Sequence, residues 1–460
     1  MPPIVDRPNG NPGPDERATR ERGPHVGWDV GLCLAAALPR LAYLLVARQP
    51  FESVYWALSD SLLRHGTLAV DGVKLTDYEP LYPLFLAVSR VLARDGVFAV
   101  QVVQIAVASM GAVCLYRLAR ALTGRPRLAV ISAVLYAGHP ILIRQAAQPS
   151  DLALVTTLVV SFSLFFVTAA TTGGAALAGV WLGLVVLTRT TMSPLLALGA
   201  AVFVWDRRPR AALAFSLATL IVASPLPIRN HLVNGSWWPT RGGLSLYLGN
   251  SSYTAALLPD EDLDILQAHA LALVEQERPD LSAAAREDAQ AVDALLTRRA
   301  LAYMAEHPFR TLGQKLRNVL YLFSPRLVPF RVATPETRVV VGPAGEIRVE
   351  HSEPRPLAEV MAYAASQSFV LVFAIAGTYV RRRDLRRDLI LGCVGATVVA
   401  VHAVYFPATR YTAPMAFVLL FYAAVALDRW SGSGLRHSAG GASRIGGRRA
   451  DPGSSRPLTE

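Results

Sequence analysis

Long apolar stretches, separated by short polar and arginine-rich segments, run through the chain from residue 29 to residue 430. Roughly 18 or more uncharged apolar residues in a row are enough for a helix to cross a bilayer. The pattern recurs about ten times and predicts a polytopic, all-α membrane protein. The predicted spans are residues 29–47, 97–116, 128–143, 152–171, 175–188, 192–205, 211–228, 358–380, 388–406 and 411–428.

Two longer segments interrupt the series of spans, at residues 48–96 and 229–356. The first contains an amphipathic stretch at 51–65 and an apolar stretch that opens with Pro80 and Pro83, and both suit helices that lie along the membrane surface. The second is predicted to be mostly helical. Its expected elements are helices at 261–278 and 283–306, a membrane-grazing helix at 315–323 and a hairpin at 338–351, where apolar residues alternate around Gly342, Pro343 and Gly345.

The two ends of the chain have compositions that cannot bury a core. Residues 1–28 contain six prolines and no apolar run, which argues against a signal peptide and makes the first span an uncleaved anchor. Residues 431–460 are rich in Gly, Ser and Arg. We therefore expect two disordered tails flanking one membrane domain, residues 29–430.

Composition excludes an ordinary soluble domain. Of the 460 residues, 52% are hydrophobic and only 17% are charged, and the mean hydropathy is +0.34. The net charge of +11 would suggest nucleic acid in a soluble chain, but many of the arginines lie in short loops between spans. The positive-inside rule accounts for them, so no nucleic-acid partner is expected.

The distribution of arginines also predicts the orientation of the chain. They concentrate in both tails and in the loops at 117–127, 205–210 and 381–387, which places these segments and both termini in the cytoplasm. The segments 48–96 and 229–356 then lie on the outer face of the plasma membrane. Any chemistry is expected there.

Familiar catalytic and metal motifs are missing from the sequence. Cys33, Cys114 and Cys393 all lie within apolar stretches and have no metal-ligand spacing. There is no GxxxxGK, GxSxG or HExxH motif, which argues against an ATP-driven transporter and the common hydrolases.

Acidic residues at the outer membrane boundary are the first candidates for chemistry. Glu52 and Asp151 each lie where a span meets the outer face, and Glu79 follows in the first loop. A carboxylate there can act as a general base on a hydroxyl group, or hold a divalent cation against a phosphate. Alternatively, each of these residues is simply a charged or capping residue at the end of a helix.

Arginines at the same boundary are the second candidates, especially Arg229, Arg241 and Arg410. An arginine at membrane depth is costly unless it faces a cavity or meets an anion. Phosphate matches the guanidinium fork well. Snorkelling toward lipid headgroups is the alternative.

Several segments, taken in order, resemble the GT-C superfamily of membrane glycosyltransferases, in particular bacterial relatives of protein O-mannosyltransferases and of the lipid A aminoarabinose transferase. The similarity extends over residues 29–430. It is carried by ESVYWALSDSLLRHG, DYEPLYPLFLA, PSDLALV, GVWLGLVVLTRTT, PLPIRNHLVNGSWWPTRGGLSLYLGN, EHPFRTLGQKLRN and ATRYTAPMAFVLL. The fold that this resemblance implies is a GT-C fold with about ten spans.

The resemblance also implies a reaction and roles for residues. The donor would be a sugar on a polyprenyl phosphate, and transfer would invert the anomeric centre, with Glu52 as base and Asp151 as a second carboxylate. In the family an Asp more often stands four residues before the loop tyrosine, and that position here is Phe51, so Glu79 is the second candidate for the base. Residues expected near the donor phosphate are Arg229, Arg410, Arg241 and Lys315.

The predicted function is therefore transfer of a sugar from a polyprenyl-phosphate donor to a cell-envelope acceptor, which is a lipid, a polysaccharide or a protein. The sugar, hexose or pentose, is open, and a divalent cation is the one cofactor left open. Two alternatives remain: a transporter or flippase of lipid-linked sugars, and a catalytically silent scaffold. A transporter would typically have inverted repeats and discontinuous spans, and the sequence shows neither.

Overall fold

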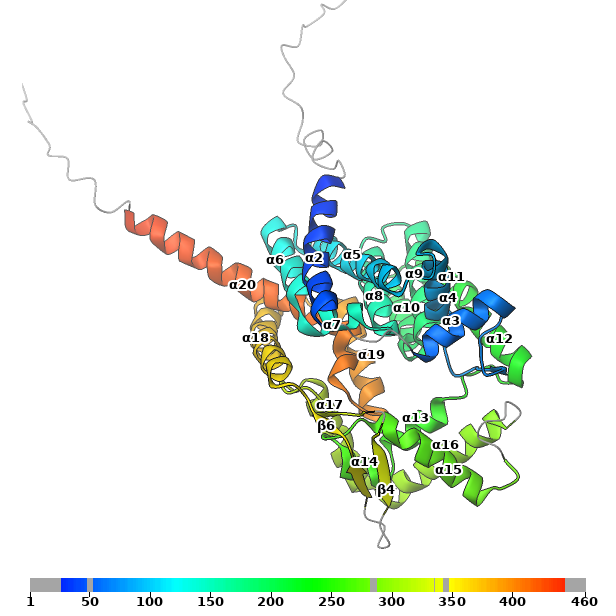
Figure 1. The fold of residues 1–460 in the computed structure, drawn as a ribbon. Coiled ribbons are helices and arrows are strands. Elements are labelled where there is room, and N and C mark those ends of the chain that lie inside the picture. Colours follow the sequence, from blue (N-terminus) through cyan, green and yellow to red (C-terminus); the bar gives the residue numbers. More distant parts are fainter. Residues whose placement is uncertain (1–25, 48–52, 282–287, 335, 342–346, 443–460) are drawn as a thin grey trace, which may run out of the picture.

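The computed structural model describes residues 26–47, 53–281, 288–334, 336–341 and 347–442. It is almost entirely helical, which confirms the predicted all-α class (Figure 1). The helices of the first half are α2 (Val26–Ala47), α3 (Val54–His65), α4 (Leu81–Leu92), α5 (Val97–Thr123), α6 (Pro126–Gly138), α7 (Pro140–Ala147), α8 (Asp151–Val167), α9 (Thr172–Thr188), the 3-10 helix η1 (Thr190–Met192), α10 (Pro194–Trp205), α11 (Pro209–Ala223) and α12 (Pro225–Asn234).

The second half contains further helices and short strands. The helices are α13 (Gly242–Gly249), α14 (Ser252–Leu257), η2 (Leu263–Ile265), α15 (Leu266–Glu277), α16 (Ala289–Glu306), α17 (Pro308–Leu322), α18 (Leu357–Arg381), α19 (Leu389–Val404), η3 (Thr409–Thr412) and α20 (Ala413–Ala442). The strands are β1 (Ala69–Val70), β2 (Val73–Lys74), β3 (Arg331–Val332), β4 (Arg338–Val341), β5 (Ile347–Glu350) and β6 (Glu353–Pro354), and they pair antiparallel as β1–β2, β3–β6 and β4–β5.

Every predicted span coincides with a helix or a helix pair. In the described part of the chain, five helices are long and apolar enough to cross a bilayer, or six if α6 and α7 are one span bent by 54°. The other predicted spans correspond to apolar helices of 10–17 residues. The protein is a membrane protein, while the predicted count of about ten spans stays a prediction.

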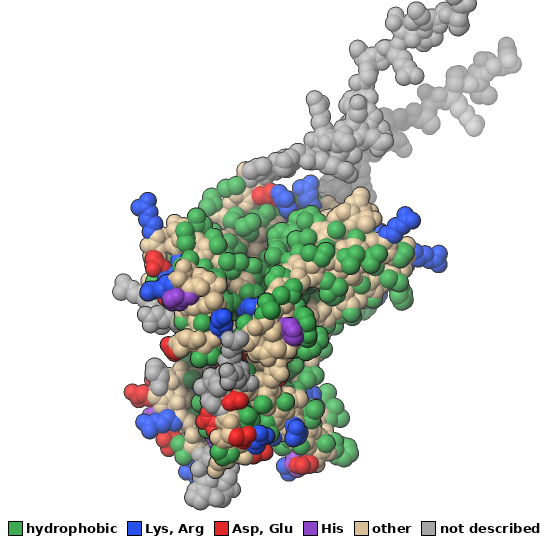
Figure 2. Space-filling view, turned by 90° about the vertical axis from the view of Figure 1, so that its right-hand side faces the viewer, with side chains coloured by type: hydrophobic (Ala, Val, Ile, Leu, Met, Phe, Trp, Pro, Cys, Tyr) green, Lys and Arg blue, Asp and Glu red, His purple; other side chains and the backbone are tan. Residues whose placement is uncertain are grey.

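The surface divides into two parts that differ in composition. Hydrophobic side chains cover the part that contains the predicted spans, which we call the helical half. Charged side chains gather over the opposite part (Figure 2). This second part is the loop region, which we define as the described residues of 235–356. It lies at the end of the molecule away from the start of α2 and the end of α20 (Figure 1). One half is therefore suited to lipid and the other to water.

Glycine allows two of the spans to approach closely. A Cβ atom on Gly179 of α9 would collide with the backbone carbonyl of Phe215 in α11, and one on Gly183 would lie 2.5 Å from the Cβ of Val222. Small residues four apart let helix backbones meet in this way.

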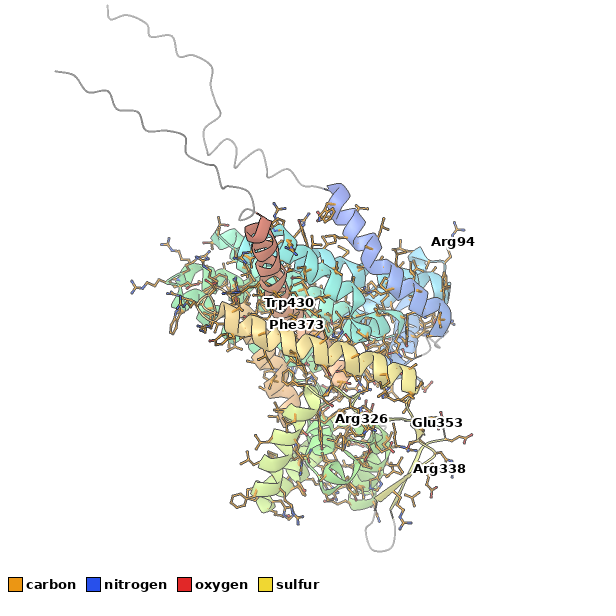
Figure 3. The ribbon with its side chains drawn as sticks, turned by 90° about the vertical axis from the view of Figure 1, so that its left-hand side faces the viewer. Arg94, Arg326, Arg338, Glu353, Phe373 and Trp430 are labelled. Carbon is orange, nitrogen blue, oxygen red and sulfur yellow. The ribbon has the colours of Figure 1, made fainter. Side chains whose placement is uncertain are left out.

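Aromatic contacts join α18 to α20, where the ring centroids of Phe373 and Trp430 are 6.1 Å apart (Figure 3).

Several predicted elements of the two long segments are observed. The stretch 51–65 contains α3, α4 follows Pro80, and α3 packs against α4. The predicted helices at 261–278 and 283–306 correspond to α15 and α16, and β4 pairs with β5 as a hairpin. Its turn, with Gly342, Pro343 and Gly345, lies outside the described residues. The sequence did not predict α13, α14 or the β1–β2 and β3–β6 pairs.

Candidate active site

Asp151 and Arg189 form an ion pair at one end of two neighbouring spans. Asp151 opens α8 and Arg189 follows the last residue of α9, and a guanidinium nitrogen of Arg189 lies 2.8 Å from Asp151 Oδ2. Only 13% of the Asp151 side chain and 16% of the Arg189 side chain are exposed. Because a buried charge is costly when it is unpaired, this pair holds both side chains in place.

Glu79 is held by the residue that follows Arg189. Its Oε1 accepts one hydrogen bond from the Thr190 backbone N–H at 2.9 Å and another from the Thr190 hydroxyl at 2.8 Å. The turn from α9 into η1 therefore positions Glu79 and Asp151 together. Burial is the main cause that raises the pKa of Glu79, and the nearby Asp151 raises it further, while the two hydrogen bonds from Thr190 and the charge of Arg189 oppose the shift.

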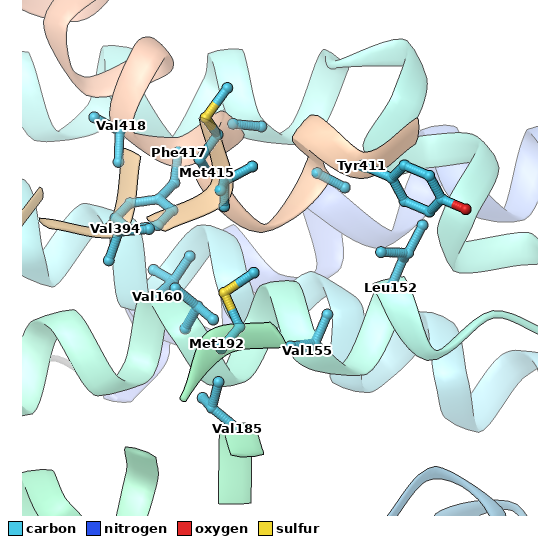
Figure 4. Close-up of a cluster of buried hydrophobic side chains, with 14 of the residues drawn as sticks. Leu152, Val155, Val160, Val185, Met192, Val394, Tyr411, Met415, Phe417 and Val418 are labelled. Carbon is cyan, nitrogen blue, oxygen red and sulfur yellow. The ribbon is translucent and has the colours of Figure 1, made fainter. Parts of the chain in front are cut away.

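Tyr411 lies between two of the arginines. The guanidinium carbon of Arg189 is 5.1 Å from the centre of the Tyr411 ring, and that of Arg410 is 5.0 Å from it. Such distances are those of cation–π contacts. Tyr411 also packs beside Leu152, at the edge of the buried core where α8, α9, α19 and α20 meet (Figure 4). The core of the helical half thereby fixes the position of η3.

Arg410 joins η3 to the loop region. Its guanidinium group donates to Asp262 Oδ2 at 2.7 Å and to Asp264 Oδ2 at 2.8 Å. Asp262 precedes η2 and Asp264 lies within it. The charge of Arg410 is therefore balanced by two carboxylates, which the sequence analysis did not single out.

Arg241 and Arg229 both contact the loop that carries Glu79. Arg241 lies with its guanidinium carbon 5.3 Å from the Tyr78 ring centre and a nitrogen 3.9 Å from Asp77 Oδ2. Arg229 donates to the backbone carbonyls of Leu75 at 3.2 Å and Tyr78 at 3.1 Å. Burial raises the pKa of Asp77, and the charge of Arg241 opposes that shift.

We call this assembly the carboxylate–arginine cluster. Neighbouring contacts link its members through Tyr78, Thr190 and Tyr411, and Asp264 lies within electrostatic range of both Arg241 and Arg410. Its charged members are Asp77, Glu79, Asp151, Arg189, Arg229, Arg241, Asp262, Asp264 and Arg410.

The structure brings together most of the residues singled out from the sequence. Glu79, Asp151, Arg229, Arg241 and Arg410 all belong to the cluster. Glu52 lies outside the described residues. The roles of these residues stay predictions, because proximity alone does not assign them.

Lys315 lies apart from the described contacts of the cluster. Its ammonium group donates to Asn250 Oδ1 and, at 2.5 Å, to the carbonyl of Val404, which ties α17 to the end of α13 and to α19. Burial lowers the pKa of Lys315 to about 8. In this structure Lys315 joins elements of the fold.

Thr190, like Asp262 and Asp264, was not singled out from the sequence. It belongs to the TRTT run at 188–191, where a polar group follows the apolar stretch of α9. That change from apolar to polar residues at the end of a span was a usable signal. What the sequence could not give is the pairing with Glu79, 111 residues away along the chain.

A metal site is not apparent among the described residues, since no group of three or more His, Cys, Asp or Glu side chains gathers there. The carboxylates of the cluster are engaged mostly by arginines. We therefore assign no step to a metal ion, and the divalent cation stays an open prediction.

The cluster combines two chemical capabilities. Its carboxylates can accept a proton from a hydroxyl group, and its arginines can balance negative charge on a phosphate. The carboxylates and the arginines both lie at the end of the spans that faces the loop region. Such an arrangement suits a displacement in which an anion leaves as a hydroxyl group attacks.

Comparison with known proteins points to one superfamily. Residues 77–228 match a family model described as dolichyl-phosphate-mannose-protein mannosyltransferase, and this stretch contains Glu79, Asp151 and Arg189. The match confirms the resemblance to the GT-C superfamily that the motifs predicted. No curated protein matches the chain significantly.

Solved structures with a similar arrangement include two bound to lipid phosphates. The chain is 16% identical to the oligosaccharyltransferase AglB of Archaeoglobus fulgidus, in complex with an inhibitory peptide and a dolichol-phosphate, with a TM-score of 0.49 over 92% of this chain and 52% of that one. It thus spans about half the length of that enzyme. ArnT of Cupriavidus metallidurans, bound to undecaprenyl phosphate, is 17% identical, with a TM-score of 0.39 over 92% of this chain and 81% of that one.

Proposed function

We propose that the protein is a membrane glycosyltransferase that moves a sugar from a polyprenyl-phosphate donor to a cell-envelope acceptor on the outer face of the plasma membrane. The acceptor class, whether lipid, polysaccharide or protein, and the choice of hexose or pentose stay open. One observation carries the proposal. The family match at 77–228 covers the part of the chain in which Glu79 and the Asp151–Arg189 pair meet.

In the proposed reaction, the acceptor hydroxyl oxygen attacks the anomeric carbon of the sugar. The bond from that carbon to the phosphate oxygen breaks, and the polyprenyl phosphate leaves with the electron pair. The hydroxyl proton passes to a carboxylate base. A single displacement of this kind inverts the anomeric configuration.

Glu52 and Glu79 are the candidates for the base. Asp151 is the weaker candidate, because Arg189 at 2.8 Å already neutralises its charge. Glu79 has no guanidinium contact among the described residues, and its raised pKa makes it the stronger proton acceptor once it is ionised. In this proposal Asp151 holds Arg189 in position, and either Glu52 or Glu79 takes the proton.

Positive charge is needed where the phosphate leaves. Arg229 and Arg241 are the best placed for this role, because Arg229 donates to the carbonyl of Tyr78 and Arg241 lies over the Tyr78 ring, next to Glu79 in the chain. One nitrogen of Arg229 is buried without a hydrogen-bond partner among the described residues. A phosphate oxygen would provide that partner.

The test is turnover of a donor by the purified protein in lipid. Labelled polyprenyl-phosphate sugars are supplied one at a time, and release or transfer of the label is followed with an envelope extract as acceptor source. Turnover of one donor supports the proposal.

The same vesicles separate the alternatives. Movement of the lipid-linked sugar across the bilayer without cleavage would support a transporter. The absence of binding, transport and turnover with every donor would favour a scaffold and contradict the proposal.

A further inference from the structure

A pocket of about 400 Å³ lies in the loop region, between the start of α14 and the junction of α16 with α17. This volume is within the range of small-molecule sites. None of its lining residues is acidic, and most of them carry a polar or basic side chain. Asn250, Ser252, Arg310, Thr311, Gln314 and Arg317 line it.

Two arginines give the pocket its charge. Arg310 has no ion pair or hydrogen bond within the described part of the chain, and Arg317 donates only to the neutral amide oxygen of Gln314, at 3.0 Å. Both side chains are exposed. Lys315, which does not line the pocket, donates to the wall residue Asn250 and adds a third positive charge nearby. Most arginines of the carboxylate–arginine cluster, in contrast, already contact carboxylates.

The sequence of α17 explains why these groups face the pocket together. Positions 310, 314 and 317 are spaced three or four residues apart and share one face of the helix. Leu312, Leu316 and Leu320 lie on the opposite face and are exposed. The helix therefore turns its basic face toward α14.

Hydroxyl groups complete the wall. The Thr311 hydroxyl oxygen is buried and has no hydrogen-bond partner among the described residues. Ser252 exposes its side chain beside the pocket and likewise has no described hydrogen bond from its hydroxyl. A buried polar group without a partner is unfavourable, and a ligand oxygen would relieve that cost.

We propose that this pocket binds an oxyanion, with phosphate as the best match. Two guanidinium groups supply forked donors for phosphate oxygens, and the hydroxyl groups supply further donors. A phosphate-bearing lipid headgroup and a soluble phosphate compound share this chemistry.

The site is separate from the one proposed for the donor. Arg241 precedes α13 and Gly249, which lines the pocket, ends it. Eight helical residues span about 12 Å, so the two sites lie at opposite ends of α13. Binding here does not depend on glycosyltransferase activity and can be tested without turnover.

The test uses the full-length protein in nanodiscs of phosphatidylcholine, with binding of inorganic phosphate measured by equilibrium dialysis. We expect saturable binding that Arg310→Gln and Arg317→Gln each weaken by about tenfold, as expected for loss of a charge-assisted hydrogen bond. Arg310→Lys, which keeps the charge, is expected to retain more of the affinity. Arg298→Gln, an exposed arginine of α16 that does not line the pocket, is the matched control and should leave binding unchanged.

A second set of nanodiscs that contain phosphatidylglycerol identifies the source of the anion. If phosphate binds more weakly in these nanodiscs, and Arg310→Gln abolishes that difference between the two lipids, a lipid headgroup competes for the pocket. Unchanged binding indicates a soluble ligand, and both results support the proposal. It is overturned if phosphate does not bind saturably, if both glutamine variants bind as well as the wild type, or if Arg241→Gln alone removes the binding.

Discussion

At the scale of single residues, the contact between Thr190 and Glu79 has the clearest consequence for chemistry. Two donors of one residue converge on a single carboxylate oxygen. Hydrogen bonds to the charged form of a carboxylate favour that form. Thr190 therefore keeps the pKa of Glu79 below the value that burial alone would give.

This contact predicts the effect of Thr190→Val. The substitution removes the hydroxyl donor but keeps the backbone N–H, so the pKa of Glu79 rises further. If Glu79 is the base, activity is lost as the pH falls through its pKa, and the acidic limb of the kcat/KM profile moves to higher pH by about one unit. The measurement is the pH profile of sugar transfer.

The neighbouring threonine provides the control for this prediction. The Thr191 hydroxyl has no hydrogen-bond partner among the described residues, so Thr191→Val should leave the acidic limb in place. Thr190→Ser should do the same, because it keeps the donor. An unmoved profile in Thr190→Val would assign the base to another group.

Residue identities were predicted better than residue partners. Asp151, Arg229, Arg241 and Arg410 were identified because charged residues at membrane depth are costly and need a reason to be there. The pairing of Arg410 with Asp262 and Asp264 was not foreseen. It joins positions about 150 residues apart, and no local pattern encodes such a contact.

At the scale of elements, apolar periodicity predicted the existence of the helices but not their breaks. The span predicted at 128–143 is divided into α6 and α7, with a bend of 54°. Pro140 causes the break, because proline removes a backbone donor and clashes with the preceding turn. The buried Arg40 donates to the carbonyls of Tyr136 and Ala137 at this break. The proline was visible in the sequence, but its arginine partner on α2 was not.

Arg40→Leu is therefore expected to destabilise the protein. It removes the side-chain donor of the buried Tyr136 carbonyl and of the partly buried Ala137 carbonyl. A buried group left unsatisfied costs about 1–3 kcal/mol. Thermal unfolding in detergent should show a lower midpoint. Arg64→Leu, an exposed arginine of α3, is the control, and an equal loss in both variants would contradict this role of Arg40.

Close packing of α9 against α11 gives a second prediction at this scale. Gly179→Ala places a methyl group against the carbonyl of Phe215 and should cost about 1–3 kcal/mol through overpacking. Gly392→Ala in α19, where no atom lies within 4 Å of the new Cβ, should leave the unfolding midpoint unchanged or slightly higher. Equal midpoints for the two variants would contradict the close approach of the helices.

At the scale of the whole molecule, the structure separates an apolar half from a charged loop region (Figure 2). The start of α2 and the end of α20 lie at the end opposite the loop region (Figure 1). Together with the distribution of arginines, this predicts cytoplasmic termini and an outward-facing loop region. The hydropathy pattern predicted this division well, because the cost of burying charge in lipid acts on every segment.

Thiol labelling in intact cells tests this orientation. In a variant whose native Cys33, Cys114 and Cys393 are replaced by alanine, Asp280→Cys lies in the loop region and Arg383→Cys follows α18. Both positions are exposed. A membrane-impermeant maleimide should label the first and not the second, and the opposite pattern would reverse the proposed orientation.

The central claim is that the carboxylate–arginine cluster forms the centre of a polyprenyl-phosphate-dependent glycosyltransferase whose base is Glu52 or Glu79. The most direct measurement is single-turnover transfer from the active donor by the wild type, Glu52→Gln, Glu79→Gln and Asp151→Asn in the same lipid. The account predicts that one of the two glutamine variants abolishes transfer while donor binding persists, and that Asp151→Asn reduces transfer less. Transfer at wild-type rates in all three variants would contradict it.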